Sequence, residues 1–223
     1  MCGRYSLTQP LDNLAQFFEL YGQQQSNLPP RWNIAPTQQS AVIRQDAGGH
    51  RALVMLRWGF AGPNNAPLIN ARSETVTTKP TFAEAFRQRR CLVPADSFYE
   101  WQAIEGHKAK QPWRIGLKGG GLFAFAGLWQ SEAAFGNAEC FTILTTSAND
   151  YLRLLHDRMP VILPPEAFAA WLNPETPAND LIALLRPYPD EKMARYRVTT
   201  AVNSVKLDSP DCFAPLNPNL RRA

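Results

Sequence analysis

The second residue of the chain is the one whose position most directly suggests chemistry. The sequence begins Met1-Cys2-Gly3-Arg4, and an initiator methionine is normally removed when the next residue is as small as cysteine. Removal would leave Cys2 with an α-amine of pKa about 7.7–8.0 beside a thiol of pKa about 8.5, so both nucleophiles would be partly reactive near neutral pH. An aldehyde could react with both groups and close a thiazolidine ring. The alternative is that Cys2 is an ordinary residue of a frayed terminus.

Three other polar residues occupy positions where a scaffold has little use for them: Asn70, Glu100 and His156. The amide of Asn70, after a proline-bounded loop, either orients an amine or a water or closes a turn onto the backbone. Aromatic residues flank Glu100, and burial among them would raise its pKa toward neutrality for proton transfer, unless it lies on an exposed strand edge. His156 ends an expected helix, either as an acid–base group or as a cation favoured by the helix dipole.

The basic residues are mostly arginines, with 17 Arg against 6 Lys in a chain of net charge +4. Arginine binds phosphate through two hydrogen bonds and stacks on bases. Three arginines, Arg4, Arg72 and Arg158, lie close in sequence to the candidate reactive residues, and Trp58 and Trp101 flank the same regions. This composition favours a nucleic acid as the polyanionic partner.

The elements that must position these side chains indicate an α+β domain. Short helices and strands alternate without a βαβ rhythm, which favours a mainly antiparallel, barrel-like β-sheet with short peripheral helices. Apolar residues at helical spacing predict a helix over Leu11 to Phe18. Strands are expected at 91–94, 140–146 and 195–202, and hairpins at 41–58 and 113–129, each hairpin turning at a glycine cluster.

Two capping patterns predict helix starts. Thr81 and Glu84 form a capping box for a short helix that ends in the arginines at 87–90. Ser147 and Asp150 are expected to cap a helix that runs to His156. Two further helices are expected near 165–172 and 179–185.

Length and composition bound the class of protein. The 223 residues, 45% of them hydrophobic, predict one domain over 1–223, with a core of about 2–207 and an extended tail at 208–223. No apolar run approaches the roughly 20 residues of a membrane span, so a cytoplasmic protein is expected. We also expect a monomer. The four cysteines form no C-x-x-C pair and the three histidines form no cluster, so neither metal nor cofactor is expected. Phosphate-loop, serine-esterase and zinc-protease motifs do not occur.

Ordered blocks along the whole chain resemble the SOS response-associated peptidase family, whose members are abasic-site processing proteins. The blocks are Met1 to Tyr5, Trp32 to Thr37, Arg57 to Gly59, Ile69 to Thr75, Cys91 to Ala95, Phe98 to Trp101, Ala126 to Trp129, Thr145 to Asn149 and His156 to Pro160.

The resemblance implies a function for Cys2 and for its neighbours. Mature Cys2 would attack the ring-opened aldehyde of an abasic site in single-stranded DNA, including single-strand/double-strand junctions, and form a thiazolidine crosslink that shields the lesion. Asn70 would hold the Cys2 amine, Glu100 would shuttle protons, and His156 would assist ring opening and crosslink reversal. In a bacterium such a protein would be associated with the nucleoid.

The resemblance also implies a DNA groove. Phosphates near the lesion would be gripped by Arg4, Arg72 and Arg158. Trp58 with Pro36 would wedge the adjacent duplex or stack on bases, and the groove would be lined by Asn33, Trp101, Thr145 and Ser147.

Two positions depart from the family pattern. The loop from Gly59 to Pro67 is short and lacks the tryptophan expected after the Trp-Gly block, which would reduce contact with a duplex. Ser97 replaces the glycine usual before the aromatic-Glu block, which would shift Glu100 slightly.

Two rival functions fit the same residues. An N-terminal cysteine whose amine serves as base could cleave amides, including the bond to Met1. Alternatively, the arginines and tryptophans could bind single strands without any covalent chemistry, with Cys2 incidental.

Overall fold

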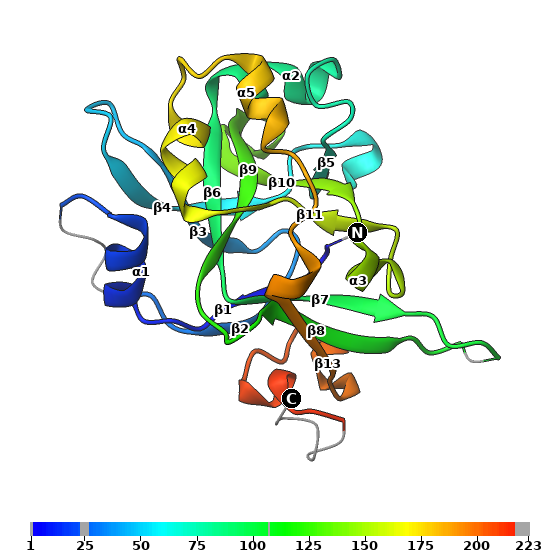
Figure 1. The fold of residues 1–223 in the computed structure, drawn as a ribbon. Helices are drawn as coiled ribbons and strands as arrows, with labels where there is room; N and C mark the ends of the chain where they lie inside the picture. The colour runs from blue at the N-terminus through cyan, green and yellow to red at the C-terminus, as the bar shows by residue number, and fades with distance from the viewer. Residues whose placement is uncertain (1, 23–26, 107, 217–223) are drawn as a thin grey trace.

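The computed structural model describes residues 2–22, 27–106 and 108–216, which form two β-sheets with short helices around them (Figure 1). The α+β class and the mainly antiparallel pairing expected from the sequence are confirmed. The elements are β1 (Tyr5–Leu7), α1 (Leu11–Phe18), β2 (Arg31–Ile34), β3 (Gln39–Gln45), β4 (Arg51–Trp58), β5 (Asn70–Arg72), α2 (Pro80–Gln88), β6 (Arg90–Ala95), β7 (Ser97–Gln102), β8 (Gln111–Leu117), β9 (Phe123–Glu132), β10 (Ala138–Ser147), α3 (Asp150–Arg153), β11 (Arg158–Pro160), β12 (Ile162–Leu163), α4 (Phe168–Leu172), α5 (Ala178–Ala183) and β13 (Met193–Arg197).

One sheet closes on itself. Its strands pair in the order β10, β4, β3, β6 and β9, and β9 pairs again with β10, so the ring is complete. Only the pairings of β10 with β4 and with β5 are parallel in this sheet. Closure pairs both edges of each ring strand and gives the barrel-like shape.

The second sheet has the strand order β13, β8, β7, β1 and β2, with every pairing antiparallel. The chain passes from the ring to this sheet at Asp96, the single residue between β6 and β7. Strand β1, the first of the chain, therefore lies inside this sheet between β7 and β2. Its pairing on both sides fixes the position of the residues just before it, including Cys2.

Phe125 joins the two sheets. Its ring, on β9, makes edge contacts with Tyr5 of β1 at 5.8 Å and with Phe98 of β7 at 5.9 Å. All three side chains are fully buried. Such edge-to-face pairs add to the stabilisation from apolar burial, so β1 and β7 are packed onto the ring from one side.

The hairpin expected at 41–58 forms as β3 and β4, whereas the one expected at 113–129 does not. Gly119, Gly120 and Gly121 all have positive φ, between 79° and 103°, and they carry the chain from the second sheet to the ring. Strand β8 pairs with β7 and β13, while β9 pairs with β6, β10 and β12. The strand–glycine–strand pattern is the same for a hairpin and for a change of sheet, so the sequence could not separate them.

The two predicted helix caps are also wrong in detail. Helix α2 begins at Pro80, whose fixed φ suits the first helical position, and no side chain caps it, so Thr81 lies inside the first turn. In α3 the cap is Asn149, whose Oδ1 accepts the Leu152 N–H at 2.9 Å. Ser147 instead ends β10. Because α3 stops at Arg153, His156 lies in the turn beyond the helix.

The C-terminal segment, defined here as residues 198–216, folds back onto the second sheet where an extended tail was expected from 208. It contains the 3-10 turns η5 (Thr200–Asn203) and η6 (Pro210–Phe213), and Cys212 within it is fully buried. Figure 1 shows it in orange and red beside β8 and β13. No helix in the described part of the chain has the length and apolar character needed to span a membrane.

Candidate functional site

Cys2 lies three residues before β1 and is fully buried. Its thiol faces the Arg4 carbonyl at 3.8 Å, and the same carbonyl accepts the Tyr99 N–H from β7 at 3.0 Å. Burial raises the pKa of the Cys2 thiol well above its usual range, and the charge of Glu100 raises it further. The thiol is therefore neutral in this state, and a base must take its proton before it can act as a nucleophile.

Glu100 projects from β7 and is 5% exposed. Burial raises its pKa to about 7, because the charged carboxylate loses its hydration. This agrees with the expectation from its aromatic neighbours in the sequence. A carboxyl group with a pKa near 7 exchanges protons readily at neutral pH, and its effect on the thiol pKa places it close to Cys2.

His156 stands in the turn between α3 and β11. Its Nδ1 lies 3.0 Å from the backbone nitrogen of Arg158, whose N–H can donate to it. Burial lowers the pKa of His156, although the Asp157 carboxylate, 2.7 Å from Nδ1, opposes this. The lowering prevails because Asp157 is 84% exposed and its charge is screened by water.

Lys110 connects these two acid–base groups electrostatically. Its charge lowers the pKa of Glu100 and that of His156, so Lys110 lies within electrostatic reach of each. Sequence reasoning missed Lys110, which precedes β8 with nothing in its neighbourhood to single it out. A bridge from Gln102 of β7 to the Leu154 carbonyl at 3.3 Å holds the same two segments together.

Asn70 is the first residue of β5, and one of the two polar atoms of its side-chain amide forms a hydrogen bond with a described residue. Its Nδ2 donates to the Ile143 carbonyl at 3.5 Å, whereas Oδ1 is buried and accepts no hydrogen bond from a described residue. A buried acceptor without a donor is unfavourable, so the site is suited to a donor such as an amine. This gives the predicted role of Asn70 a physical basis.

Trp58 is not a surface residue, which corrects its predicted role as a wedge or base-stacking platform. Its side chain is fully buried, stacks on Phe141 and contacts the Tyr5 ring at 5.1 Å. Its Nε1 donates to the Ile69 carbonyl at 3.0 Å. Trp58 therefore links β1 to the residue that precedes Asn70. Pro36 is partly exposed next to it, in a turn where the Thr37 N–H donates to the Trp58 carbonyl at 2.9 Å.

Four of the predicted DNA-binding residues meet along β5, β10 and β11. Arg72 pairs with Thr145, and Ser147 pairs with Arg158. Arg72 and Ser147 are exposed, but Thr145 is fully buried and cannot line a groove with its side chain. Arg158 forms a two-pronged ion pair with Glu74, with Nη2 at 2.9 Å from Oε2. Its charge is thus already compensated, whereas Arg72 forms no salt bridge with a described residue.

The other predicted residues, Arg4, Asn33 and Trp101, all bind the C-terminal segment. The Arg4 Nη1 donates to Asn33 Oδ1 at 2.8 Å and to the Val202 carbonyl at 2.7 Å. The Trp101 Nε1 donates to Asn203 Oδ1 at 2.7 Å. Asn33 is fully buried, so it holds the fold together and does not line a groove. The Arg4 guanidinium takes part in the same contacts, so only part of it is available to a phosphate.

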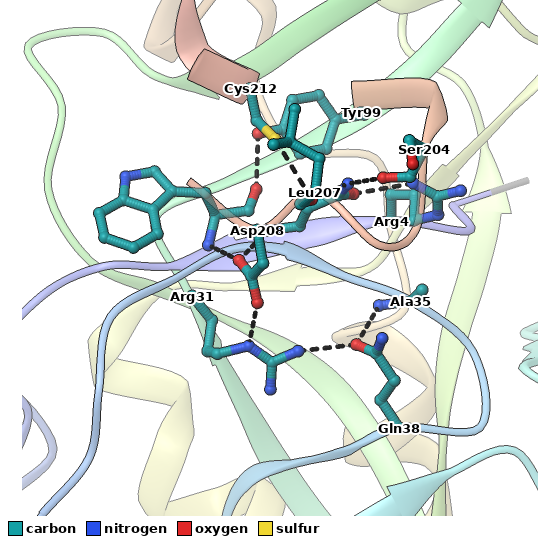
Figure 2. A network of polar contacts seen from close by, with 11 residues as sticks. Arg4, Arg31, Ala35, Gln38, Tyr99, Ser204, Leu207, Asp208 and Cys212 are labelled. Atoms are coloured by element: carbon teal, nitrogen blue, oxygen red, sulfur yellow. Dashed lines mark hydrogen bonds and ion pairs between the residues drawn. The ribbon is translucent and has the colours of Figure 1, made fainter. Parts of the chain in front are cut away.

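Asp208 completes this network, and sequence reasoning missed it (Figure 2). Its Oδ1 accepts the backbone N–H groups of Trp32 at 2.6 Å and Asn33 at 3.0 Å, and Oδ2 accepts Arg31 Nε. Asn33 Nδ2 in turn donates to carbonyls of the C-terminal segment, including Leu207 at 2.8 Å. Strand β2 is thereby fixed to a segment about 175 residues away.

The arrangement brings together a thiol, a carboxyl group titrating near neutrality and a neutral imidazole. Two proton carriers with pKa values set by different surroundings can serve as acid and base in one reaction. Among the described residues, no group of three His, Cys, Asp or Glu side chains is placed to hold a metal ion. The four cysteines are buried and form no disulfide.

Known proteins resemble the chain over nearly its whole length. The model of the SOS response associated peptidase (SRAP) family matches residues 1–205. Abasic site processing protein YoaM of Bacillus subtilis is 39% identical over 226 residues, covering 95% of this chain and 96% of that protein. Abasic site processing protein YedK of Escherichia coli is 30% identical, covering 97% and 100%. A solved structure from Bacteroides thetaiotaomicron, 24% identical, shares the fold with a TM-score of 0.80 over 100% of both chains.

The raised pKa of Glu100 makes stability depend on pH. The folded protein holds the Glu100 proton up to about pH 7, whereas the unfolded chain releases it near pH 4.3, so folding stability falls as pH rises through this window. Glu100→Gln removes the ionisation. We expect its stability relative to the wild type to increase by up to about 3 kcal/mol between about pH 4 and pH 8 in urea denaturation. Exposed Glu105→Gln is the control, and a pH-independent difference for Glu100→Gln would contradict the assignment.

Asp208 should stabilise the fold far more than its acidic neighbour in the same segment. Asp208→Asn replaces a charged acceptor of backbone N–H groups and Arg31 with a neutral amide, which should lower the free energy of unfolding by about 2–3 kcal/mol. Asp211→Asn, at an exposed position, should change it by less than about 0.5 kcal/mol. Urea denaturation measures both. Equal effects of the two substitutions would show that the network does not carry this stabilisation.

Proposed function

The chain belongs to the SOS response associated peptidase family, and on this premise we propose that it captures abasic sites in single-stranded DNA through a covalent bond to Cys2. Relatives across the length of the chain are named as abasic site processing proteins, which supports the lesion as substrate. An abasic site in its ring-opened form presents an aldehyde. An N-terminal cysteine reacts with an aldehyde through two groups at once, whereas other nucleophilic side chains have one.

The reaction needs Met1 to be removed, because the amide bond to Met1 blocks the Cys2 amine. The free amine then adds to the aldehyde carbon and loses water to form an imine. The thiol adds to the same carbon, its proton passes to the imine nitrogen, and a thiazolidine ring closes. One C–N and one C–S bond form, and one water leaves, so no oxidant or cofactor is consumed.

The observation that carries this proposal is the buried carboxyl group of Glu100 on β7. The same strand pairs with β1, and its Tyr99 N–H binds the Arg4 carbonyl that the Cys2 thiol faces. With a pKa of about 7, Glu100 can protonate the departing water and can take a proton from the thiol at the same pH. The imidazole of His156, whose pKa is lowered by burial, can donate a proton to the sugar oxygen as the ring opens. The buried Oδ1 of Asn70 can accept a hydrogen bond from the Cys2 amine.

Single-stranded DNA suits the site because no partner strand covers the lesion. Exposed Arg72 is available for a phosphate, and Trp101, partly exposed beside Arg4, is available for stacking on a base. Binding at single-strand/double-strand junctions would use the turn at Pro36 and the short loop from Gly59 to Pro67. That loop lacks a tryptophan, so we expect its contact with a duplex to be small.

A second activity is favoured by the description of the family as a peptidase. The Cys2 thiol, with Glu100 as base, could cleave the bond between Met1 and Cys2 and so produce the mature terminus itself. A separate aminopeptidase would give the same product.

Cys2→Ala should abolish crosslinking. The wild-type protein, incubated with a single-stranded oligonucleotide carrying one abasic site, should give a species with the mass of protein without Met1 plus oligonucleotide minus one water. Intact-mass spectrometry detects it, and Cys212→Ala, which alters a different buried cysteine, should still give it. Crosslinking by Cys2→Ala would overturn the proposal. Binding without any covalent species in the wild type would leave a non-covalent single-strand binding module.

Arg72→Gln should weaken binding and reduce its dependence on salt. Loss of one phosphate contact on a single strand should reduce the slope of log K against log salt by about 0.7. Fluorescence anisotropy of an intact single-stranded oligonucleotide over a range of salt concentrations measures this. Arg87→Gln, exposed on α2 and paired with Glu84, is the matched control and should leave the slope unchanged. An unchanged slope for Arg72→Gln would remove Arg72 from the phosphate contacts.

A further inference from the structure

The second sheet carries a cleft on the face opposite the candidate site. Register places Tyr99, Arg114 and Tyr196 side by side on one face, and Glu100 and Trp113 on the other. The cleft has a volume of about 730 Å³ and is bounded by the end of β1, strands β8 and β13, the glycine loop after β8 and the turn η6. The residues that line it have no part in the proposed reaction of Cys2.

The floor of the cleft is formed by Gly116 and Ala194, which pair across β8 and β13. A Cβ at Gly116 would lie 3.1 Å from the Asp96 carbonyl oxygen, so a larger residue would both crowd the backbone and fill the space. The three glycines at 119–121 form one rim, and a Cβ at any of them would have no other atom within 4 Å. The floor and this rim therefore present backbone, with no side chain larger than the methyl group of Ala194.

Two arginines line the cleft, but the Arg195 guanidinium lies over the Tyr151 ring and donates to the Tyr151 carbonyl. Arg114 therefore provides the charge, and it is held in place by neutral groups. Its Nε donates to Ser97 Oγ at 2.9 Å, and its Nη1 contacts the Tyr196 hydroxyl at 3.4 Å. The guanidinium carbon lies 3.8 Å from the centre of the Phe213 ring. Within the described ranges, Arg114 forms no salt bridge. A partly buried guanidinium that is fixed but lacks a counter-anion is suited to an anionic ligand.

The one acidic residue that lines the cleft, Asp96, already accepts hydrogen bonds from neighbouring residues. Asp96 is 6% exposed, and its Oδ2 accepts the N–H and the hydroxyl of Thr8, each at 2.6 Å. Its Oδ1 accepts the Ser6 hydroxyl. Asp96 thus fixes the wall formed by the end of β1, and its carboxylate is turned to these donors and not to Arg114.

We propose that this cleft binds a phosphomonoester carried on a ring-bearing body of nucleotide size. The Arg114 guanidinium would bind the phosphate, because its planar fork matches phosphate oxygens. The floor of Gly116 and Ala194 and the edge of Phe213 would contact the ring. The volume lies in the range of small-ligand sites, roughly 300–1,000 Å³. The phosphate belongs either to a free mononucleotide or to the phosphorylated end of a DNA strand, and the site does not depend on the proposed function of Cys2.

Isothermal titration calorimetry with adenosine monophosphate, adenosine and inorganic phosphate tests the ligand class. We expect saturable binding of the monophosphate and binding of adenosine weaker by about tenfold or more. Arg114→Gln should weaken monophosphate binding by about tenfold. Arg197→Gln, which removes the same charge from the opposite face of β13, should leave it unchanged. Absence of saturable monophosphate and phosphorylated-DNA binding at millimolar concentration, or undiminished binding by Arg114→Gln, would overturn the proposal.

Short DNA strands with a 5′-phosphate or a 5′-hydroxyl distinguish the two sources of phosphate. Preferential binding of the phosphorylated strand, lost in Arg114→Gln, would identify a DNA end, and binding of the mononucleotide alone would identify a free nucleotide. Backbone NMR shifts should move at Gly119, Gly120 and Gly121, and shifts confined to the Cys2 site would contradict the location.

Arg114→Lys keeps the positive charge, and it replaces Arg114→Gln as the test variant if Arg114→Gln does not fold. It should retain monophosphate binding more strongly than any neutral substitution but lose part of the affinity given by the planar fork. Crosslinking of abasic DNA by the Arg114 variants should equal that of the wild type, so failure of this inference and failure of the proposed Cys2 chemistry are separable.

Discussion

The candidate site depends on the pairing of β1 with β7. Tyr5 lies opposite Phe98, and the Arg4 carbonyl receives the Tyr99 N–H, so the first residues of the chain are held against the strand that carries Glu100. A terminal strand in the middle of a sheet cannot fray as a free end would. Cys2 is therefore placed as firmly as a residue in the interior of a domain.

Burial then sets the chemistry. Burial between the two sheets removes water from Glu100, which raises the pKa of its carboxyl group to about 7, and from Cys2, which raises the pKa of its thiol. The same loss of water strengthens the electrostatic interaction between the two groups. The packing that buries Glu100 and Cys2 therefore also shifts their pKa values. A substitution that loosens the contact between the sheets would alter both the packing and the pKa values.

The two faces of the second sheet have different roles. One face is directed to the ring and carries Glu100, while the other carries the cleft around Arg114. The C-terminal segment reaches both regions, because Val202 binds Arg4 near the start of β1 and Phe213 packs on Arg114. Asp208 lies between these contacts and fixes the segment to β2.

The sequence by itself determined the α+β class, the β3–β4 hairpin and helix α1, because each depends on local periodicity or on neighbouring residue types. It left Glu100 either buried among aromatic residues or on an exposed strand edge, and the structure shows it buried. Residue types and positions selected Cys2, Asn70 and His156 as candidates, and the family blocks suggested their roles. Only the tertiary structure decided that Trp58 is buried, that Arg158 is paired with Glu74, and that the glycines at 119–121 change sheets. It alone revealed Asp208, whose partners are about 175 residues away. Such contacts arise from packing between distant segments, and no local pattern in the chain encodes them.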